Sequence, residues 1–173
     1  SNGHLFSSFI KLLSELRDQA IPFSLVLRSF GNDIPIVTQE LMQHGIRIQQ
    51  QGYFKEGALH LQEQQLTMPQ EIFQAIQPGQ HQAWRDDWNY WHTHKHKAAY
   101  GKPFYLSEQQ PLSLFFDDKA CEKEIIHLQR LDGQEMTKEA AIAQGYLFAV
   151  DTLAAIREEN YFCDQVWAAL KRV

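Results

Sequence analysis

The sequence lacks the features that mark several large classes of protein. Its 173 residues include only two cysteines, Cys121 and Cys163, which excludes a disulfide scaffold and favours the reduced thiols of a cytoplasmic protein. Basic residues are not in excess, since 16 Lys and Arg face 21 Asp and Glu, so we expect no nucleic-acid partner. No apolar run is long enough to span a bilayer and no signal peptide is visible, so we expect no membrane partner.

The short motifs of several enzyme classes are also missing. There is no Walker A motif and no Rossmann glycine motif, which argues against those two modes of nucleotide binding. Ser29 does not lie in a G-x-S-x-G frame, and neither cysteine has the local sequence of a catalytic nucleophile. The sequence therefore offers no support for a nucleophilic triad.

The pattern of apolar residues predicts a single α/β domain over residues 1–173. A hydrophobic content of 44% with 21% charged residues is ordinary for a globular domain with a real core. Short apolar runs predict buried strands, and helical periodicity predicts helices between or after them. The predicted strands lie near residues 23–28, 104–106, 112–116 and 125–131. The predicted helices lie at 5–19, 34–44, 68–76 and 83–99, with two more between 137 and 173, and a hairpin or flap lies at 46–61.

Polar and charged residues stand at the ends of three predicted strands. Ser29 follows the first strand, Lys102 precedes the second, and Asp117 and Asp118 follow the third. A hydroxyl donor, a cation and paired carboxylates are the parts of a Mg²⁺-dependent phosphate site, because Mg²⁺ favours one or two carboxylates together with phosphate oxygens and water. The alternative is that Asp117 and Asp118 form only a solvated strand end or a helix cap.

An unusually aromatic segment, residues 84–91, allows two interpretations. Its sequence is Trp-Arg-Asp-Asp-Trp-Asn-Tyr-Trp. One interpretation is a core helix that turns Arg85, Asp86 and Asp87 outward. The other is a lid over a site, with these three charges in a polar cluster beneath the aromatic face.

Three histidines alternate along the chain just after this segment. His92, His94 and His96 would face one side of a strand and bind Zn²⁺ or Cu²⁺ there, but a helix would scatter them over different faces. Because we predict a helix at this point, and because Lys95 and Lys97 are close, a solvated basic segment is favoured. A metal-binding module remains the alternative.

Taken in order, four stretches resemble an uncharacterised family with a haloacid-dehalogenase-like (HAD-like) fold. The stretches are residues 23–33, residues 84–91, Gly101-Lys102 and residues 114–118. The resemblance implies a three-layer Rossmannoid α/β sandwich, with residues from about 46 to 99 as a cap or insertion. It implies Mg²⁺-dependent phosphohydrolase chemistry on a phosphorylated small molecule or phosphoprotein. In this chemistry Ser29 and Lys102 are the catalytic residues, and Asp117 and Asp118 hold the metal.

One part of the family's site has no counterpart in this sequence. HAD-like phosphatases use an Asp nucleophile in a D-x-D motif after their central strand, and no D-x-D occurs here. Without that strand, we expect two sheet edges and an inactive or incomplete site. We expect an upstream segment to supply the strand, with another chain as the alternative source. The competing hypothesis is a non-catalytic interaction domain of the same fold, which docks a protein partner through residues 84–91.

Overall fold

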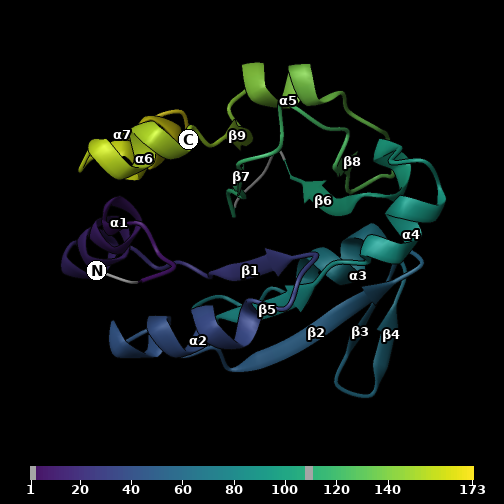
Figure 1. Cartoon of the computed structure of the whole chain (residues 1–173), viewed down its shortest axis with the longest axis horizontal. Helices are drawn as coiled ribbons and strands as arrows, with labels where there is room; N and C mark the ends of the chain where they lie inside the picture. The colour runs from purple at the N-terminus through teal and green to yellow at the C-terminus, as the bar shows by residue number, and fades with distance from the viewer. Residues whose placement is uncertain (1–2, 108–110) are drawn as a thin grey trace.

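The protein has a mixed α/β fold with open sheets, as the alternation of apolar runs and helical segments predicts. The computed structural model describes residues 3–107 and 111–173 (Figure 1). The strands in this part of the chain form one five-stranded sheet and two separate pairs. None of the described helices combines the length and the apolar character that crossing a membrane requires.

The larger sheet combines three parallel strands with an antiparallel extension. In spatial order its strands are β1 (Val26–Ser29), β5 (Gln82–Arg85), β2 (Gln50–Lys55), β3 (Ala58–Leu61) and β4 (Gln64–Leu66). β1, β5 and β2 are parallel, whereas β3 and β4 continue from β2 as an antiparallel meander. The segment 46–99 thus contributes four of the five strands, and its role as a cap or insertion stays a prediction.

The prediction of one helix over residues 83–99 was wrong. The segment begins in β5, which lies between β1 and β2 and buries Trp84. It continues as a short helix, α4 (Trp88–Thr93), and a 3-10 turn, η1 (Ala98–Tyr100). Lys95 has a φ of +59°, a conformation that a helix cannot include, so α4 has ended before it. A strand that is buried on both faces does not alternate between apolar and polar residues. The aromatic residues of β5 therefore gave no strand pattern, and together with those of α4 they resembled one helical segment.

The remaining four strands form two parallel pairs. β6 (Lys102–Leu106) pairs with β8 (Ile126–Arg130), and β7 (Phe115–Asp117) pairs with β9 (Leu147–Ala149). All residues of β6 are buried, and Phe104 and Leu106 pack with Phe115 in one apolar cluster. The strands predicted near 23–28, 104–106, 112–116 and 125–131 are thus present as β1, β6, β7 and β8, each with bounds a few residues different. β9 was not predicted, because three residues are too few to show a period.

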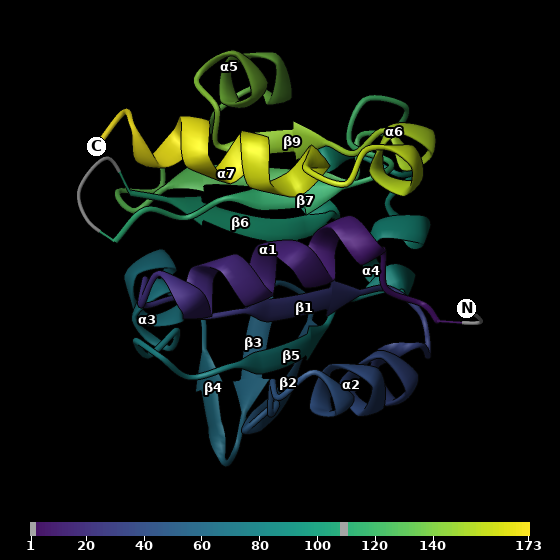
Figure 2. The ribbon, with the colours of Figure 1, turned by 90° about the vertical axis from the view of Figure 1, so that its left-hand side faces the viewer.

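Helices cover the strands, and the first helix meets the last. α1 (Ser7–Asp18), α6 (Thr152–Arg157) and α7 (Tyr161–Leu170) gather on one side of the strands (Figure 2). Their buried side chains form one apolar cluster: Leu12, Leu16, Ala155, Phe162, Cys163 and Val166. Three further helices lie elsewhere on the surface: α2 (Ile34–Gln43), α3 (Pro69–Gln74) and α5 (Lys138–Ala143). Three helices therefore follow residue 137, where we expected two.

Both cysteines are free, as predicted. Cys163 is buried on α7, and burial together with the neighbouring Glu15 raises the pKa of its thiol to about 11. Cys163 is therefore a neutral thiol that fills the core, and not a nucleophile.

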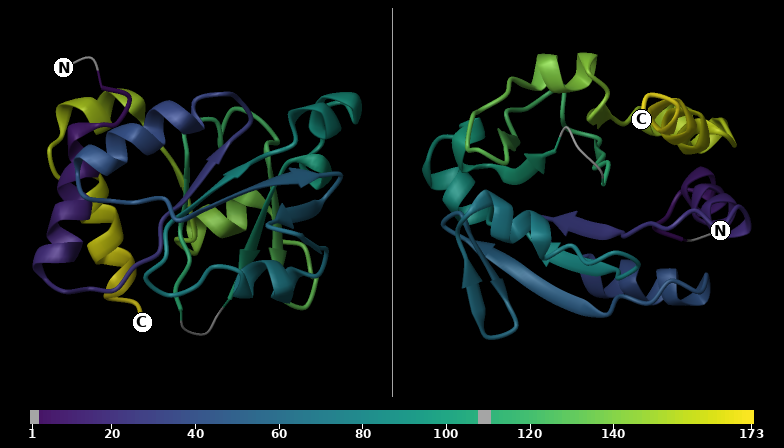
Figure 3. Two further views of the ribbon diagram at one scale, coloured as in Figure 1. Left: turned by 90° about the horizontal axis from the view of Figure 1, so that it is seen from below. Right: turned by 180° about the vertical axis from the view of Figure 1, so that it is seen from behind.

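A split separates the five-stranded sheet from the β7–β9 pair. Among the described strands, β1 pairs only with β5 and β7 pairs only with β9. α1 crosses in front of this split in Figure 2, and the view from behind in Figure 3 shows the same separation. All four residues of β1 are only half-buried, although the apolar run at 23–28 predicts a buried strand. The strand is less buried than expected because one of its edges has no described neighbour.

The direction of the backbone groups shows which part of β1 faces the split. The carbonyl oxygens of Leu25 and Ser29 accept hydrogen bonds from residues 82 and 86 at the β5 side, at 2.8 and 2.7 Å. Backbone groups alternate along a strand, so those of Val26 and Arg28 point to the opposite edge. This edge presents a pattern of donors and acceptors that fits a further strand.

Acidification is expected to weaken the start of β1 through His81. Leu25 N donates a hydrogen bond to His81 Nδ1 at 3.0 Å, so this nitrogen has to be unprotonated. Burial lowers the pKa of His81 below its ordinary value of 6.5. The bond therefore stabilises the fold above pH 6.5, and this contribution, at most about 1 kcal/mol, is lost as the pH falls below that value toward the lowered pKa.

Thermal unfolding between about pH 7 and pH 5 measures this effect, with His81→Asn as the control. Asparagine offers an oxygen near the position of Nδ1 but does not titrate. The wild-type melting temperature should therefore fall more steeply with acidification than that of the variant. Equal slopes would contradict this role of His81.

Candidate functional site

A buried ion pair joins the start of β6 to the end of β7. Lys102 Nζ lies 2.9 Å from Asp117 Oδ2, and the two residues are 8% and 7% exposed. The other carboxylate oxygen of Asp117 accepts a hydrogen bond from Lys119 N at 2.7 Å. Charged residues are rarely buried to this degree unless they are paired, so the pair fixes the relative position of β6 and β7.

A second buried ion pair connects β1 with the end of β5. Arg28 Nη2 lies 2.6 Å from Asp86 Oδ1, and Arg28 Nε donates to Asp86 Oδ2 at 3.1 Å. The two parallel bonds match the fork of the guanidinium to the two oxygens of the carboxylate. Asp86 is only 3% exposed, so Arg28 provides the positive charge that makes its burial tolerable.

The two ion pairs form one electrostatic cluster. Burial raises the pKa of the Asp86 carboxyl above its ordinary value, and the charge and hydrogen bonds of Arg28 oppose this rise. Lys102 also lowers the pKa of Asp86, and Asp117 raises it, so the charges of one pair act on the other. The cluster of Arg28, Asp86, Lys102 and Asp117 therefore contains two formal positive and two formal negative charges in a poorly solvated place.

Aromatic rings surround the cations of this cluster. The guanidinium of Arg28 lies 5.0 Å from the ring centre of Phe54, 5.7 Å from that of Trp84 and 5.4 Å from that of Phe115. Lys102 Nζ lies 5.1 Å from the ring centre of Phe30. Because Phe115 belongs to β7 and Arg28 to β1, this contact bridges the split between the sheets. The rings attract the cations and keep water away from them.

Ser29 stands at the end of β1 but is engaged locally. Its hydroxyl donates a hydrogen bond to Asp33 Oδ1 at 2.5 Å and accepts one from Gly31 N at 2.9 Å. Asp33 directly precedes α2, but its side chain makes no capping bond to this helix and binds Ser29 instead. The structure shows no contact between Ser29 and either Lys102 or Asp117 among the described residues.

Asp118 is exposed, one position beyond the end of β7. It makes no hydrogen bond or ion pair with the residues that the structure describes. The pair Asp117 and Asp118 thus consists of one buried, paired carboxylate and one solvated carboxylate. In that same part of the chain, no three His, Cys, Asp or Glu side chains are grouped closely enough to hold a metal ion by themselves.

Sequence reasoning placed Lys102 and Asp117 together correctly but missed half of the cluster. Arg28 was not considered as a site residue, because it stands at the end of the apolar run 23–28. It lies within β1, and a charge in a strand that is partly buried has to be paired. Asp86 was placed either on a helix with its charges turned outward or in a polar cluster with Arg85 and Asp87, and in neither interpretation beside Arg28. The signal in the sequence is a second Asp-Asp pair: Asp86 and Asp87 directly follow β5, much as Asp117 and Asp118 stand at the end of β7. Asp87 is the cap of α4, accepting from Tyr90 N at 3.0 Å.

The three alternating histidines do not converge on one point. His92 Nδ1 and His96 Nε2 are 3.0 Å apart, and His92 also stacks on Trp88. His94 turns away from them, with its Nδ1 2.8 Å from Tyr90 O and its ring on Tyr100 at 3.9 Å between centres. Only His92 lies in α4, His94 stands at the C-terminal end of this helix, and His96 has a φ of +57°, so the turn that ends the helix separates His94 from the other two side chains.

A cleft of about 630 Å³ adjoins the charged cluster at the carboxyl ends of β1, β5 and β2. Asp86 is the member of the cluster that lines it, Phe30 lines it as well, and α4 forms one wall. Its volume is typical of small-molecule sites, and ligands of open α/β sheets bind at such strand ends. The position and the buried charges make this cleft the candidate site.

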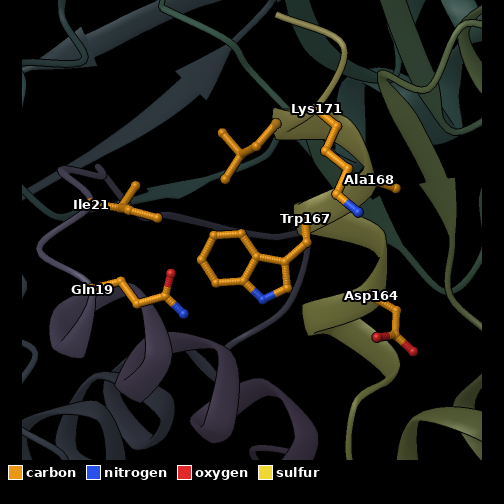
Figure 4. Close-up of a pocket in the computed structure, with 7 residues that line it drawn as sticks. Gln19, Ile21, Asp164, Trp167, Ala168 and Lys171 are labelled. Carbon is orange, nitrogen blue, oxygen red and sulfur yellow. The ribbon is translucent and has the colours of Figure 1, made fainter.

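A larger cleft, of about 840 Å³, lies between the end of α1 and the end of α7 (Figure 4). Its lining is mainly apolar, with Trp167 and Ile21, and its charged residues are Asp164 and Lys171. No buried charge cluster adjoins it, and Trp167 Nε1 is already bonded to Glu15 Oε2 at 3.0 Å. We therefore place the candidate site at the smaller cleft, where polar groups converge.

The fold and the site together define a mixed α/β protein with a cluster of buried ion pairs beside a strand-end cleft. No protein-family model, curated protein or solved structure matches this chain. The function therefore has to be argued from the site itself.

Proposed function

We propose that the protein is a HAD-like α/β domain whose strand-end site binds a phosphoryl group together with Mg²⁺, as in Mg²⁺-dependent phosphohydrolases. The observation that supports this most is the buried pair of Lys102, at the start of β6, and Asp117, at the end of β7. A lysine within 2.9 Å of a carboxylate at strand ends is suited to an anion that arrives with a divalent cation.

The residues present fit Mg²⁺ in the number and chemistry of their oxygens. Toward the described residues, Asp117 uses one acceptor position on each oxygen, for Lys102 and for Lys119 N, which leaves a second lone pair on each oxygen for a metal ion. Asp118 offers an additional carboxylate from the solvent side. One or two carboxylates, completed by water and phosphate oxygens, are what Mg²⁺ takes in such sites, and the metal would neutralise and polarise the phosphoryl group.

Each side chain has a distinct role in this proposal. Lys102 binds a phosphate oxygen with its ammonium group while it remains paired with Asp117. The Ser29 hydroxyl donates a hydrogen bond to another phosphate oxygen, in place of the bond that it now donates to Asp33 Oδ1. Arg28 and Asp86 neutralise each other, so in this proposal they position the neighbouring strands β1 and β5 and do not bind the phosphate.

The nucleophile would come from a strand that binds in the split between β1 and β7. The sequence contains no D-x-D, so the described part of the site positions a phosphate but has no aspartate at the place that the resemblance requires. β1 and β7 each have an edge with no partner among the described strands, and this supports this part of the proposal, because a strand between them would satisfy the backbone groups of both. Phosphate binding, and not hydrolysis, is therefore the property to measure first.

Isothermal titration with inorganic phosphate, with and without Mg²⁺, tests the proposal. We expect binding that requires Mg²⁺ and that Asp118→Asn weakens about tenfold, because one carboxylate ligand becomes neutral. Asp118 is exposed, so this variant should fold as the wild type does. Glu122→Gln is the matched control, since Glu122 is an exposed acid four residues away that pairs with Lys119.

Two outcomes would contradict the proposal: no binding of phosphate with Mg²⁺, or equal weakening by Asp118→Asn and Glu122→Gln. The first would favour the non-catalytic alternative, an interaction domain of the same fold. For that alternative the aromatic segment offers mainly Trp88, since Trp84 and Trp91 are buried in the core.

A further inference from the structure

The candidate cleft presents two exposed aromatic rings on different elements. Tyr53 of β2 is 49% exposed and Trp88 of α4 is 42% exposed, and both line the cleft. Large aromatic side chains are costly to leave in water, and exposed ones inside a concave site are favoured contacts for ligands. The phosphohydrolase chemistry proposed above gives these rings no role.

Each of the two rings is held against a histidine. Tyr53 stacks on His60, with ring centres 4.7 Å apart and an interplanar angle of 1°. Trp88 stacks on His92, with ring centres 4.3 Å apart and an angle of 12°. One face of each ring is thus occupied, and the exposed remainder belongs to the cleft. Rings supported in this way bind a planar group with little loss of side-chain entropy.

The charges around the cleft are balanced and leave two cations available to an anionic ligand. Lys55 and Arg85 line it, and neither side chain forms an ion pair with any residue that the structure describes. Of the three acidic lining residues, Asp86 pairs with Arg28, and Asp87 accepts bonds from Tyr90 N and Glu56 N. The formal charges of Glu56 and Asp87 balance those of Lys55 and Arg85, so the lining as a whole does not repel an anion.

The cleft and the phosphate site share a boundary. Phe30 lines the cleft, and Lys102 Nζ lies 5.1 Å from the centre of its ring. Asp86 also lines the cleft and is within the electrostatic influence of Lys102 and Asp117. A ligand with its phosphate beside Lys102 would therefore extend its organic part into the cleft.

We propose that this cleft binds the planar ring of an aromatic phosphate ester, with Trp88 and Tyr53 as its stacking surfaces. This inference rests on the phosphate site proposed above and names the class of its substrate. The ester oxygen carries the ring toward the cleft, and Lys55 and Arg85 attract the anion as it approaches.

Calorimetric titration with phenyl phosphate and with cyclohexyl phosphate, both with Mg²⁺, tests the inference. The two esters have the same charge and similar size, but only phenyl phosphate has a planar π-system. We expect phenyl phosphate to bind about tenfold more tightly, as stacking on a fixed aromatic surface predicts. Trp88→Leu should reduce this preference to about twofold or less, whereas Trp88→Phe, which keeps a ring, should retain most of it.

The outcomes separate this inference from the phosphate site on which it rests. Equal affinities of the wild type for the two esters, with inorganic phosphate still bound, would overturn the aromatic preference alone. A preference that survives in Trp88→Leu and in Tyr53→Leu would overturn the assignment of the stacking surfaces. Failure of inorganic phosphate and of both esters to bind would overturn the phosphate site as well.

Discussion

Replacing Lys102 by methionine is expected to lower the free energy of unfolding by about 3–5 kcal/mol, the usual cost of removing one partner of a buried ion pair. Methionine has nearly the same length and fills the space, so the loss comes from the charge. Asp117 would stay buried, and among the described residues the bond from Lys119 N would be the one left to stabilise its carboxylate. Urea denaturation of wild type and variant measures the difference.

Two further variants separate the charge effect from other effects of this substitution. Lys119→Met removes a lysine from an exposed position near the same carboxylate and should change stability by no more than about 0.5 kcal/mol. Adding Asp117→Asn to Lys102→Met should restore most of the loss, because the unpaired buried charge disappears. A double variant as unstable as Lys102→Met alone would show that packing, and not charge, causes the effect.

Replacing Arg28 by methionine is expected to have a comparable cost, about 3–5 kcal/mol at neutral pH. Asp86 would lose both bonds of its bidentate partner in the most buried place of the cluster. Arg28→Lys should recover only part of this stability, because an ammonium group cannot form the same two parallel bonds.

The destabilisation by Arg28→Met should depend on pH in a defined direction. Burial already raises the pKa of Asp86 above 3.8, and loss of Arg28 removes the main influence that opposes the rise. The folded variant therefore binds the proton more tightly than the unfolded chain, so the penalty is present at high pH and vanishes as the pH falls toward 3.8. Denaturation at several pH values measures this. A penalty that is constant with pH would mean that Asp86 does not carry the effect.

The parts of this structure that follow from local pattern were predictable. The end of an apolar run marks the end of a strand, and a charge at that position can reach a neighbouring strand end. Asp117 was found in this way and Lys102 by its place just before an apolar run, and the structure brings Lys102 Nζ to 2.9 Å from Asp117 Oδ2. Ser29 was placed at the end of β1 by the same reasoning, but its local bond to Asp33 was not foreseen, since a hydroxyl takes the nearest acceptor.

The parts that depend on tertiary arrangement were not predictable from local pattern. β5 lies between two parallel strands, and only this position explains why Gln82 and Trp84 are buried next to each other. The sequence alone cannot show that Arg28 meets Asp86, because 58 residues separate them and the order of the strands decides the contact. β9 is specified mainly by its pairing with β7, not by its own three residues.

The inward course of Arg28 has a consequence for the association of the protein with itself. A strand edge with free backbone groups is a template for pairing with another molecule, and proteins limit this risk with charges that point inward beside the edge. Arg28 does not serve in this way, because Asp86 and the rings of Phe54 and Trp84 hold its guanidinium over the neighbouring strands β5 and β2. The edge of β1 that fits the strand proposed above therefore also fits a strand of a second molecule, so self-association through β1 would compete with completion of the site.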